Sequence, residues 1–239
     1  MIHVYADGAD YNGIMEAAMN KDIKGFTTNP TLMKAAGITN FSDFAHNIIP
    51  RLKSIRPDTN ISLEVFADEK EEMRRQAKII AGWGDKFEYK VYVKIPVMNT
   101  QGVYNYDLIK ELLEEGTNVN VTAVFTKYQS MGILEKLEKK VGSLIISVFA
   151  GRVADTLRDP EKVMTDCMYQ DRDRKAEFLW ASCREVFNYT QAYRTGCDII
   201  TMTPDQIKKF SLRNKDLEQY SKETVQMFYN DAQKSGFAL

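Results

Sequence analysis

Lys94 is the residue of this chain whose surroundings most clearly suggest chemistry. It lies in the run YKVYVKIPV, whose largely apolar character predicts a buried strand. Desolvation disfavours the ammonium form, so a lysine in such a strand can hold a free amine that attacks a carbonyl carbon and forms an imine. The alternative is structural, with the amine reaching solvent at a strand end or pairing with a carboxylate. Lys90 is better explained in that second way.

Polar residues near the ends of other apolar runs point to a shared pocket. Strand side chains alternate between faces, so residues two apart share a face, which in a closed barrel is the interior. A buried hydrogen-bonding group without a partner costs on the order of 1–3 kcal/mol, so repeated polar pairs need a common explanation. We expect a polar pocket at the C-terminal mouth of a barrel, where barrel enzymes place their active sites. The pairs are Tyr5 and Asp7, Thr27 and Asn29, Ser62 and Glu64, Tyr92 and Lys94, Asn120 and Thr122, Ser147 and Phe149, and Trp180 and Ser182.

Eight short β-rich runs alternate with helix-like segments, a pattern typical of a parallel sheet built from βα units. Segments 69–83 and 104–115 carry apolar residues at three- and four-residue spacings, as helices around a barrel should. The length of 239 residues suits one α/β barrel, since such barrels often hold about 250. We predict a single-domain (β/α)8 TIM barrel over residues 1–239, with an additional C-terminal helix near 217–236. The predicted strands are 2–7, 25–29, 61–66, 91–97, 118–123, 143–149, 177–182 and 198–201.

The composition excludes several classes of function. Lysine and arginine number 32 against 33 acidic residues, so no net field would recruit nucleic acid or an anionic membrane. Two histidines cannot form a three-histidine zinc site, and neither a Walker loop nor GxGxxG is present. No apolar run approaches the ~20 residues that cross a bilayer, and three widely spaced cysteines indicate free thiols. We expect a soluble cytoplasmic protein without metal, cofactor, nucleic-acid partner or membrane contact.

Each candidate residue also has a structural explanation. Asp7 could cap the following helix, and Asn29 could begin a helix whose first residue is a proline. Glu64 could be a structural ion-pair partner of Lys94. Arg152 and Arg184 could be ordinary surface arginines. The predicted pocket would be wrong only if all of these structural explanations held at once. We therefore favour the shared pocket over the structural explanations.

Eight blocks of the chain resemble those of the transaldolase family and occur in the family's order, over about residues 2–205. They are VYADGAD, GFTTNPTL, ISLEVFAD, VYVKIPV, NVNVTAVF, ISVFAGRV, ASCR and CDIITMTP. The family fold is a (β/α)8 barrel, in agreement with the strand count above. The resemblance implies an enzyme that forms a lysine Schiff base with sugar phosphates and needs no cofactor.

The resemblance also implies a role for each candidate residue. Lys94 would form the Schiff base, and Asp7 would take the proton of the sugar hydroxyl whose carbon–carbon bond breaks. Protons would be carried during imine formation and hydrolysis by Glu64, Thr122 and an ordered water. Guanidinium groups are well suited to phosphate, which would be held by Arg152, Ser182 and Arg184. The bound triose unit would be contacted by Thr27, Asn29, Asn120, Ser147 and Phe149.

The resemblance bears on the reaction as well. The related fructose-6-phosphate aldolases typically carry Gln where this chain has Glu64 and Tyr where it has Phe149. These residues favour transfer of a dihydroxyacetone unit from fructose 6-phosphate or sedoheptulose 7-phosphate to an aldose phosphate. The short chain and its IPVMNTQG segment look more like the aldolase group, so a lyase releasing free dihydroxyacetone is the alternative. A noncatalytic sugar-phosphate-binding barrel is a third hypothesis.

Two segments lie outside these assignments. Residues 217–236 resemble the C-terminal helix that short family members pack against a neighbouring subunit, which implies a homo-oligomer such as a pentamer or decamer. Residues 158–175 are charged and match no family block, so we expect them to influence the choice of acceptor.

Overall fold

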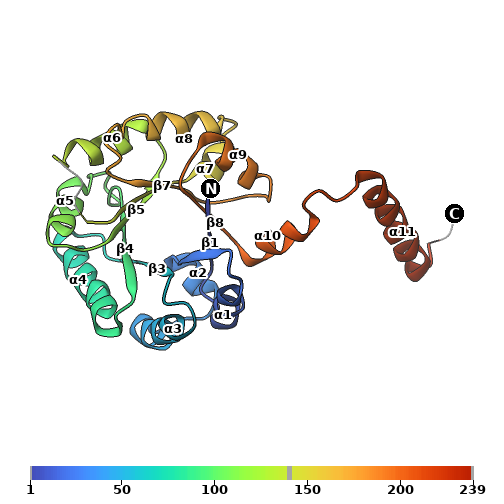
Figure 1. The fold of residues 1–239 in the computed structure, drawn as a ribbon, viewed down its shortest axis with the longest axis horizontal. Coiled ribbons are helices and arrows are strands. Elements are labelled where there is room, and N and C mark those ends of the chain that lie inside the picture. The colour runs from blue at the N-terminus through green and yellow to red at the C-terminus, as the bar shows by residue number, and fades with distance from the viewer. Residues whose placement is uncertain (1, 139–141, 238–239) are drawn as a thin grey trace. The chain divides into compact units, whose positions relative to one another are not determined.

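The computed structural model describes residues 2–138 and 142–237, and its strands close into one parallel barrel in chain order (Figure 1). This confirms the predicted TIM barrel. Each predicted strand is present, with ends that differ by up to two residues. The strands are β1 His3–Asp7, β2 Ile23–Thr27, β3 Asn60–Glu64, β4 Lys90–Pro96, β5 Val119–Val124, β6 Leu144–Val148, β7 Glu177–Trp180 and β8 Ile199–Met202.

Helices surround the barrel and cover it with their apolar faces (Figure 1). The predicted helix 69–83 continues to Phe87 and ends where Glu88 takes a left-handed conformation, with φ of 50°. The segment 158–175 contains an outer helix, α8, which contacts its neighbours in the ring. The helices that follow the first seven strands are α1 Tyr11–Met19, α2 Pro30–Ala35, α3 Phe41–Ile55, α4 Lys70–Phe87, α5 Tyr106–Glu114, α6 Lys127–Glu135, α7 Ala150–Ala154, α8 Pro160–Met168 and α9 Asn188–Thr195. Two more, α10 Pro204–Lys208 and α11 Leu217–Ser235, follow the last strand.

The chain divides into two compact units, one up to Ile207 and one from Lys208 onward. The first unit holds the barrel. The second contains a short 3-10 helix, Lys209–Leu212, and α11, which ends at Gly236 in a left-handed conformation. None of the side chains of α11 is buried. No helix in the described ranges combines the length and the apolarity that a membrane crossing requires.

The interior of the barrel below the mouth contains a cluster of apolar and aromatic side chains. The cluster is buried and is formed by Tyr5, Tyr92, Ile145, Leu179, Ala181 and Ile199. The prediction that Trp180 faces this interior is wrong. Ser147 pairs with Leu179 across β6 and β7, which places Leu179 on the inward face and the next residue, Trp180, on the outward face. The strand ends at Trp180, so its alternation does not extend to Ser182.

Candidate active site

Lys94 is buried near the C-terminal end of β4 and has two hydrogen-bond partners. Its Nζ lies 2.9 Å from Oε2 of Glu64 and donates over 2.9 Å to the backbone carbonyl of Thr28. Glu64 ends β3 and stands directly beside Lys94 in the sheet register. The side chains of Lys94 and Glu64 are only 7% and 15% exposed. Taking either charge out of water alone would cost several kcal/mol, so each group stabilises the other's burial.

Asp7 lies at the end of β1, and Thr27 Oγ1 donates to its Oδ1 over 2.7 Å. Burial raises the pKa of Asp7 above its ordinary value, while the charge of Lys94 and the Thr27 hydrogen bond oppose that rise. The alternative that Asp7 caps the next helix is wrong. The side chain that caps α1 is Asp10, whose Oδ2 accepts from the Gly13 amide over 2.7 Å. Asp7 is therefore available to a ligand in the pocket.

A cavity of about 190 Å³ opens at this mouth and brings most of the predicted residues together. Glu64 and Asn120 are the predicted residues that do not line it. A larger groove of about 350 Å³, lined by Met33, Phe41 and Phe66 among others, contains Lys34 as its one ionisable side chain. The lining residues of the mouth cavity are Asp7, Thr27, Asn29, Lys94, Thr122, Ser147, Phe149, Arg152, Leu179, Ala181, Ser182, Cys183, Arg184, Thr201, Thr203 and Gln206.

Thr122 presents a hydroxyl to the cavity from the end of β5. Among the described residues, its Oγ1 is buried without a hydrogen-bond partner. The next residue, Ala123, has a φ of 59°, and the register with β6 shifts between Val121 and Val124. An irregularity of this kind re-aims the side chains beside it. A buried hydroxyl that lines a polar cavity is suited to a hydrogen bond with a ligand or with solvent.

Asn120 supports the cavity from below. It is fully buried, its Nδ2 donates to Ser62 Oγ over 3.1 Å, and its Oδ1 accepts from Ser147 Oγ over 2.7 Å. The amide thus connects β3, β5 and β6 through side chains inside the barrel. Its geometry orients Ser147, which does line the cavity.

Asn29 fits both of the explanations given for it. Its Oδ1 accepts from the Leu32 amide over 2.9 Å, so it caps α2, with Pro30 in the first turn. The same residue lines the cavity. Because the cap uses only the carbonyl oxygen, the amide group remains as a donor for a ligand.

The loop after β7 carries Ser182 and Arg184 and is held closely against α7. A Cβ on Gly151 would come within 1.6 Å of the Ser182 carbonyl oxygen, so this approach requires glycine. Gln206 donates to the Cys183 carbonyl over 3.0 Å, and Asn188 accepts from the Arg184 amide over 2.7 Å. Ser182 itself has a φ of 63°. Contacts from three other segments therefore determine the position of this loop.

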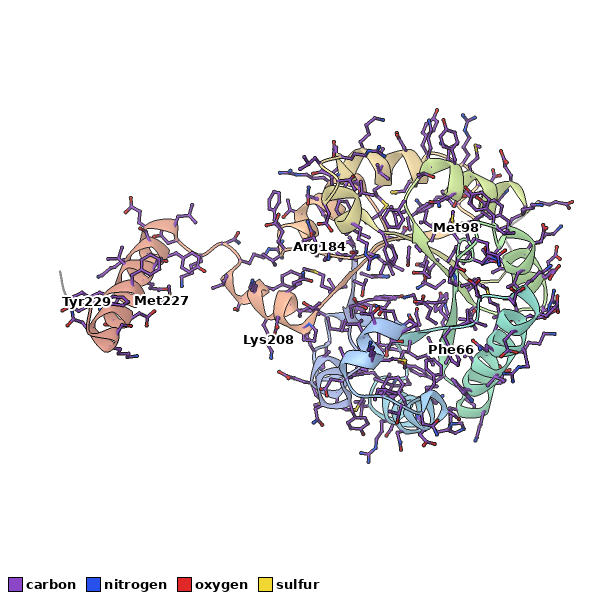
Figure 2. All side chains as sticks on the ribbon, turned by 180° about the vertical axis from the view of Figure 1, so that it is seen from behind. Phe66, Met98, Arg184, Lys208, Met227 and Tyr229 are labelled. Atoms are coloured by element: carbon purple, nitrogen blue, oxygen red, sulfur yellow. The ribbon has the colours of Figure 1, made fainter. Side chains whose placement is uncertain are left out.

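The two arginines at the cavity are partly exposed but have defined partners. Arg184, labelled in Figure 2, pairs with Asp155 through Nε over 3.2 Å and also through Nη2. Its Nη1 end is free of that contact and can bind an anion. The Arg152 guanidinium lies 5.7 Å from the ring centroid of Phe149. Both side chains line the cavity, so the geometry allows the phosphate contact that is predicted for them.

Sequence reasoning missed several lining residues. Thr201 ends the predicted eighth strand and shares its inward face with Ile199, so strand alternation was a signal that pointed to it. No periodicity applies to residues that follow strand ends, which are Cys183, Thr203 and Gln206.

Burial and the nearby Asp7 raise the pKa of the Cys183 thiol, so it stays protonated at neutral pH. The described cysteines are free thiols, as predicted.

Fold and site together define a TIM barrel whose mouth holds a buried lysine beside two carboxyl groups, with two arginines at the rim. A family model described as Transaldolase/Fructose-6-phosphate aldolase matches residues 4–239. The chain belongs to this family, as its sequence blocks predicted.

Proteins from several bacteria are similar to the chain over most of its length. One from Anaeromyxobacter sp. (strain Fw109-5), named "Probable transaldolase", is 30% identical over 90% of this chain and 94% of its own length. Another of that name, from Dehalococcoides mccartyi, is 28% identical over 84% of this chain and 86% of its own length. A solved structure from Coccidioides immitis that carries a fructose-1,6-biphosphate aldolase name has a TM-score of 0.58. It is 11% identical and covers 90% of this chain and 78% of its own, a likeness of fold alone.

The buried carboxyl of Asp7 predicts a gain in stability when its charge is removed. Because burial raises the pKa in the folded chain above the ordinary value of 3.8, ionised Asp7 opposes folding at neutral pH. The unmodified protein recovers this stability as the pH falls through the folded pKa. We therefore expect Asp7→Asn to melt at a higher temperature at pH 7, with a smaller gain at pH 4. Calorimetry measures both, with the exposed Asp231→Asn as control; an equal gain at both pH values would contradict the assignment.

Proposed function

We propose that the chain is a transaldolase that moves a dihydroxyacetone unit from a ketose phosphate to an aldose phosphate through a Schiff base on Lys94. Fructose 6-phosphate and sedoheptulose 7-phosphate are the donors of the expected type. The observation that carries the proposal is the position of Lys94 Nζ, which is buried beside Glu64 at a cavity that also contains Asp7. Binding alone needs no buried amine, so the arrangement favours an enzyme over a noncatalytic sugar-phosphate-binding barrel.

Imine formation begins at Lys94. Glu64 Oε2, 2.9 Å from Nζ, is positioned to take a proton from the ammonium group and leave a free amine. The amine attacks the ketone carbon of the donor, and the resulting carbinolamine loses water to give the iminium ion. Thr122 has a buried hydroxyl with no partner among the described residues, which suits it to pass protons through a water molecule during this step.

Carbon–carbon cleavage then requires a base at the sugar hydroxyl. Asp7 takes the hydroxyl proton, the bond between the third and fourth carbons breaks, and the aldehyde product leaves. The electron pair remains on the three-carbon unit as an enamine conjugated with the Lys94 nitrogen. Attack of this enamine on the acceptor aldehyde reverses the sequence, and Asp7 returns its proton to the new hydroxyl group. Thr27, Asn29 and Ser147 line the cavity and can bond the triose hydroxyls.

Transfer and release differ in the fate of the enamine. Release of free dihydroxyacetone, the lyase alternative, requires protonation of the enamine carbon and hydrolysis of the three-carbon imine by water, whereas transfer hydrolyses only the imine of the new ketose. Phe149 has no hydroxyl to orient that water, and its ring packs against the apolar barrel interior and 5.6 Å from the Phe125 ring. This favours transfer.

The unpaired cysteines support a reducing compartment, and we propose the cytoplasm.

We expect fructose 6-phosphate and borohydride to leave a reduced adduct on Lys94, detected by peptide mass. Lys94→Met should abolish the adduct, because a thioether cannot form an imine. Lys90→Met is the matched control, since it removes an exposed lysine from the same strand and should leave the adduct on Lys94. Product formation only when erythrose 4-phosphate is present indicates a transferase, whereas free dihydroxyacetone without acceptor indicates the lyase. No adduct on the unmodified chain would reject both.

We expect Arg184→Ala to raise the KM for phosphorylated donors by about tenfold or more, because a hydrogen bond to a charged group contributes about 1.5–3 kcal/mol. The effect on kcat should be smaller, since the phosphate lies away from the reacting carbons. Arg75→Ala removes an exposed arginine from α4 and serves as the charge control. If the unmodified enzyme shows the same KM for phosphorylated and unphosphorylated donors, Arg184 does not bind phosphate.

We further propose that α11 packs against another copy of the chain in a closed homo-oligomer, a pentamer or a decamer. Its large apolar side chains are exposed within the described part of the chain, among them Leu217, Val225 and Phe228, with Met227 and Tyr229 labelled in Figure 2. Exposed apolar surface of this kind is typical of an interface.

Light scattering should give the full chain a mass several times that of the monomer. Phe228→Glu should lower that mass, because a charge in an apolar interface is costly to bury. Gln226→Glu, which adds the same charge at a polar and exposed position of α11, should not. A monomeric full chain at micromolar concentration would refute the oligomer and would leave the proposed reaction untouched.

A further inference from the structure

Three side chains on adjacent strands form a chain of hydrogen bonds that ends at Asp7. Thr27 Oγ1 donates to Asp7 Oδ1 over 2.7 Å, and Thr27 Oγ1 lies 2.5 Å from Thr201 Oγ1. The residues come from β2, β1 and β8, so the two hydroxyl groups meet across the end of β1. Thr27 is 2% exposed and Thr201 5% exposed. Both line the cavity that contains Lys94.

The single hydrogen on each threonine hydroxyl determines which group donates in each of these hydrogen bonds. A threonine hydroxyl has one hydrogen and two acceptor lone pairs. Thr27 gives its hydrogen to the Asp7 carboxylate, so it cannot also donate to Thr201. The 2.5 Å contact therefore requires Thr201 to be the donor and Thr27 the acceptor. A hydroxyl that accepts one hydrogen bond becomes a stronger donor in the next, and this effect is larger where the dielectric is low.

We propose that Thr201 is a positioning residue for the Asp7 base and acts through Thr27. Its hydrogen bond directs the Thr27 hydrogen toward Asp7 Oδ1, which leaves Oδ2 as the oxygen that receives the proton of the sugar hydroxyl. It also strengthens the bond that supports the ionised carboxylate. This inference rests on the proposed function only for the role of Asp7 as a base; the coupling of Thr201 to Asp7 holds without it.

Other groups around Asp7 also influence its ionisation and must be kept unchanged in any test. Lys94 on β4 favours the carboxylate, and Glu64 on β3 opposes it. Cys183, in the loop after β7, carries a thiol whose pKa is raised in part by Asp7. None of these side chains contacts Thr201 through a hydrogen bond described for this chain. Replacing Thr201 alone thus tests the hydroxyl chain separately from the charged groups.

The main experiment is a carbon-13 NMR titration of the aspartate carboxyl groups, with the Asp7 signal identified by its loss in Asp7→Asn. We expect Thr201→Val, which keeps the side-chain shape, to raise the pKa of Asp7 by roughly a few tenths, the size of a 10–30% change in one charge-assisted bond. Thr201→Ser restores a hydroxyl and should return the pKa to its original value. Thr59→Val is the control: it removes another buried hydroxyl, bonded to the Arg56 carbonyl and to Tyr89 Oη.

A kinetic measurement separates positioning from general loss of structure. Because Asp7 acts at cleavage, Thr201→Val should move the acidic limb of kcat/KM for fructose 6-phosphate to higher pH and lower the rate up to about fourfold below that limb. Trapping of dihydroxyacetone on Lys94 by borohydride needs no cleavage and should proceed at the original rate.

The outcomes distinguish this inference from the proposed function. An unchanged Asp7 pKa in Thr201→Val would overturn the inference, as would a change that Thr201→Ser fails to reverse, or an equal change in Thr59→Val. An unmodified chain that forms no adduct with fructose 6-phosphate would reject the proposed reaction, while the titration would still decide the coupling between Thr201 and Asp7.

Discussion

The burial of the Lys94 amine is the constraint on which the rest of the site depends. A lysine at 5% exposure inside a barrel must find partners within the protein, and the partners here are the Glu64 carboxylate and the Thr28 carbonyl. Glu64 lies beside Lys94 in the register of β3 with β4, and Thr28 directly follows the end of β2, so the closed sheet itself places both. The same burial that would penalise an isolated ammonium group brings a proton acceptor within 2.9 Å of the nitrogen. Stability and the proposed reactivity thus depend on the same two side chains.

The polar groups around this pair fall into two kinds. The first kind has hydrogen-bond partners within the protein. Its members connect three strands and are Asn120, Ser62 and Ser147. Thr122 instead keeps a buried hydroxyl that no described residue satisfies. Burying a polar group that keeps a hydrogen-bond partner changes the free energy of folding little. Burying one without a partner costs its full desolvation free energy. Because Thr122 lines the cavity, a ligand or solvent there can supply the missing hydrogen bond.

The rim of the cavity is built by a different principle. Strand alternation does not extend to Ser182 and Arg184, which lie in a loop with a left-handed residue. Their position follows from the close approach of Gly151, the hydrogen bond from Gln206 and the ion pair of Arg184 with Asp155. These contacts join segments that follow three different strands. The proposed anion binding at this rim therefore depends on the packing of loops, whereas the proposed lysine chemistry depends on the sheet.

The sequence by itself determined the barrel and the inward face of most strands, because strand periodicity and apolar content are local properties of the chain. For that reason the sequence could place five polar residues together at one mouth of the barrel: Asp7, Thr27, Lys94, Thr122 and Ser147. What the sequence could not determine depends on distance between segments. Trp180 was assigned to the wrong face because the register of β7 against β6 decides its side. The partner of Arg184 and the Thr201 contact with Thr27 were decided only by the tertiary structure, since each joins atoms whose separation no local pattern encodes.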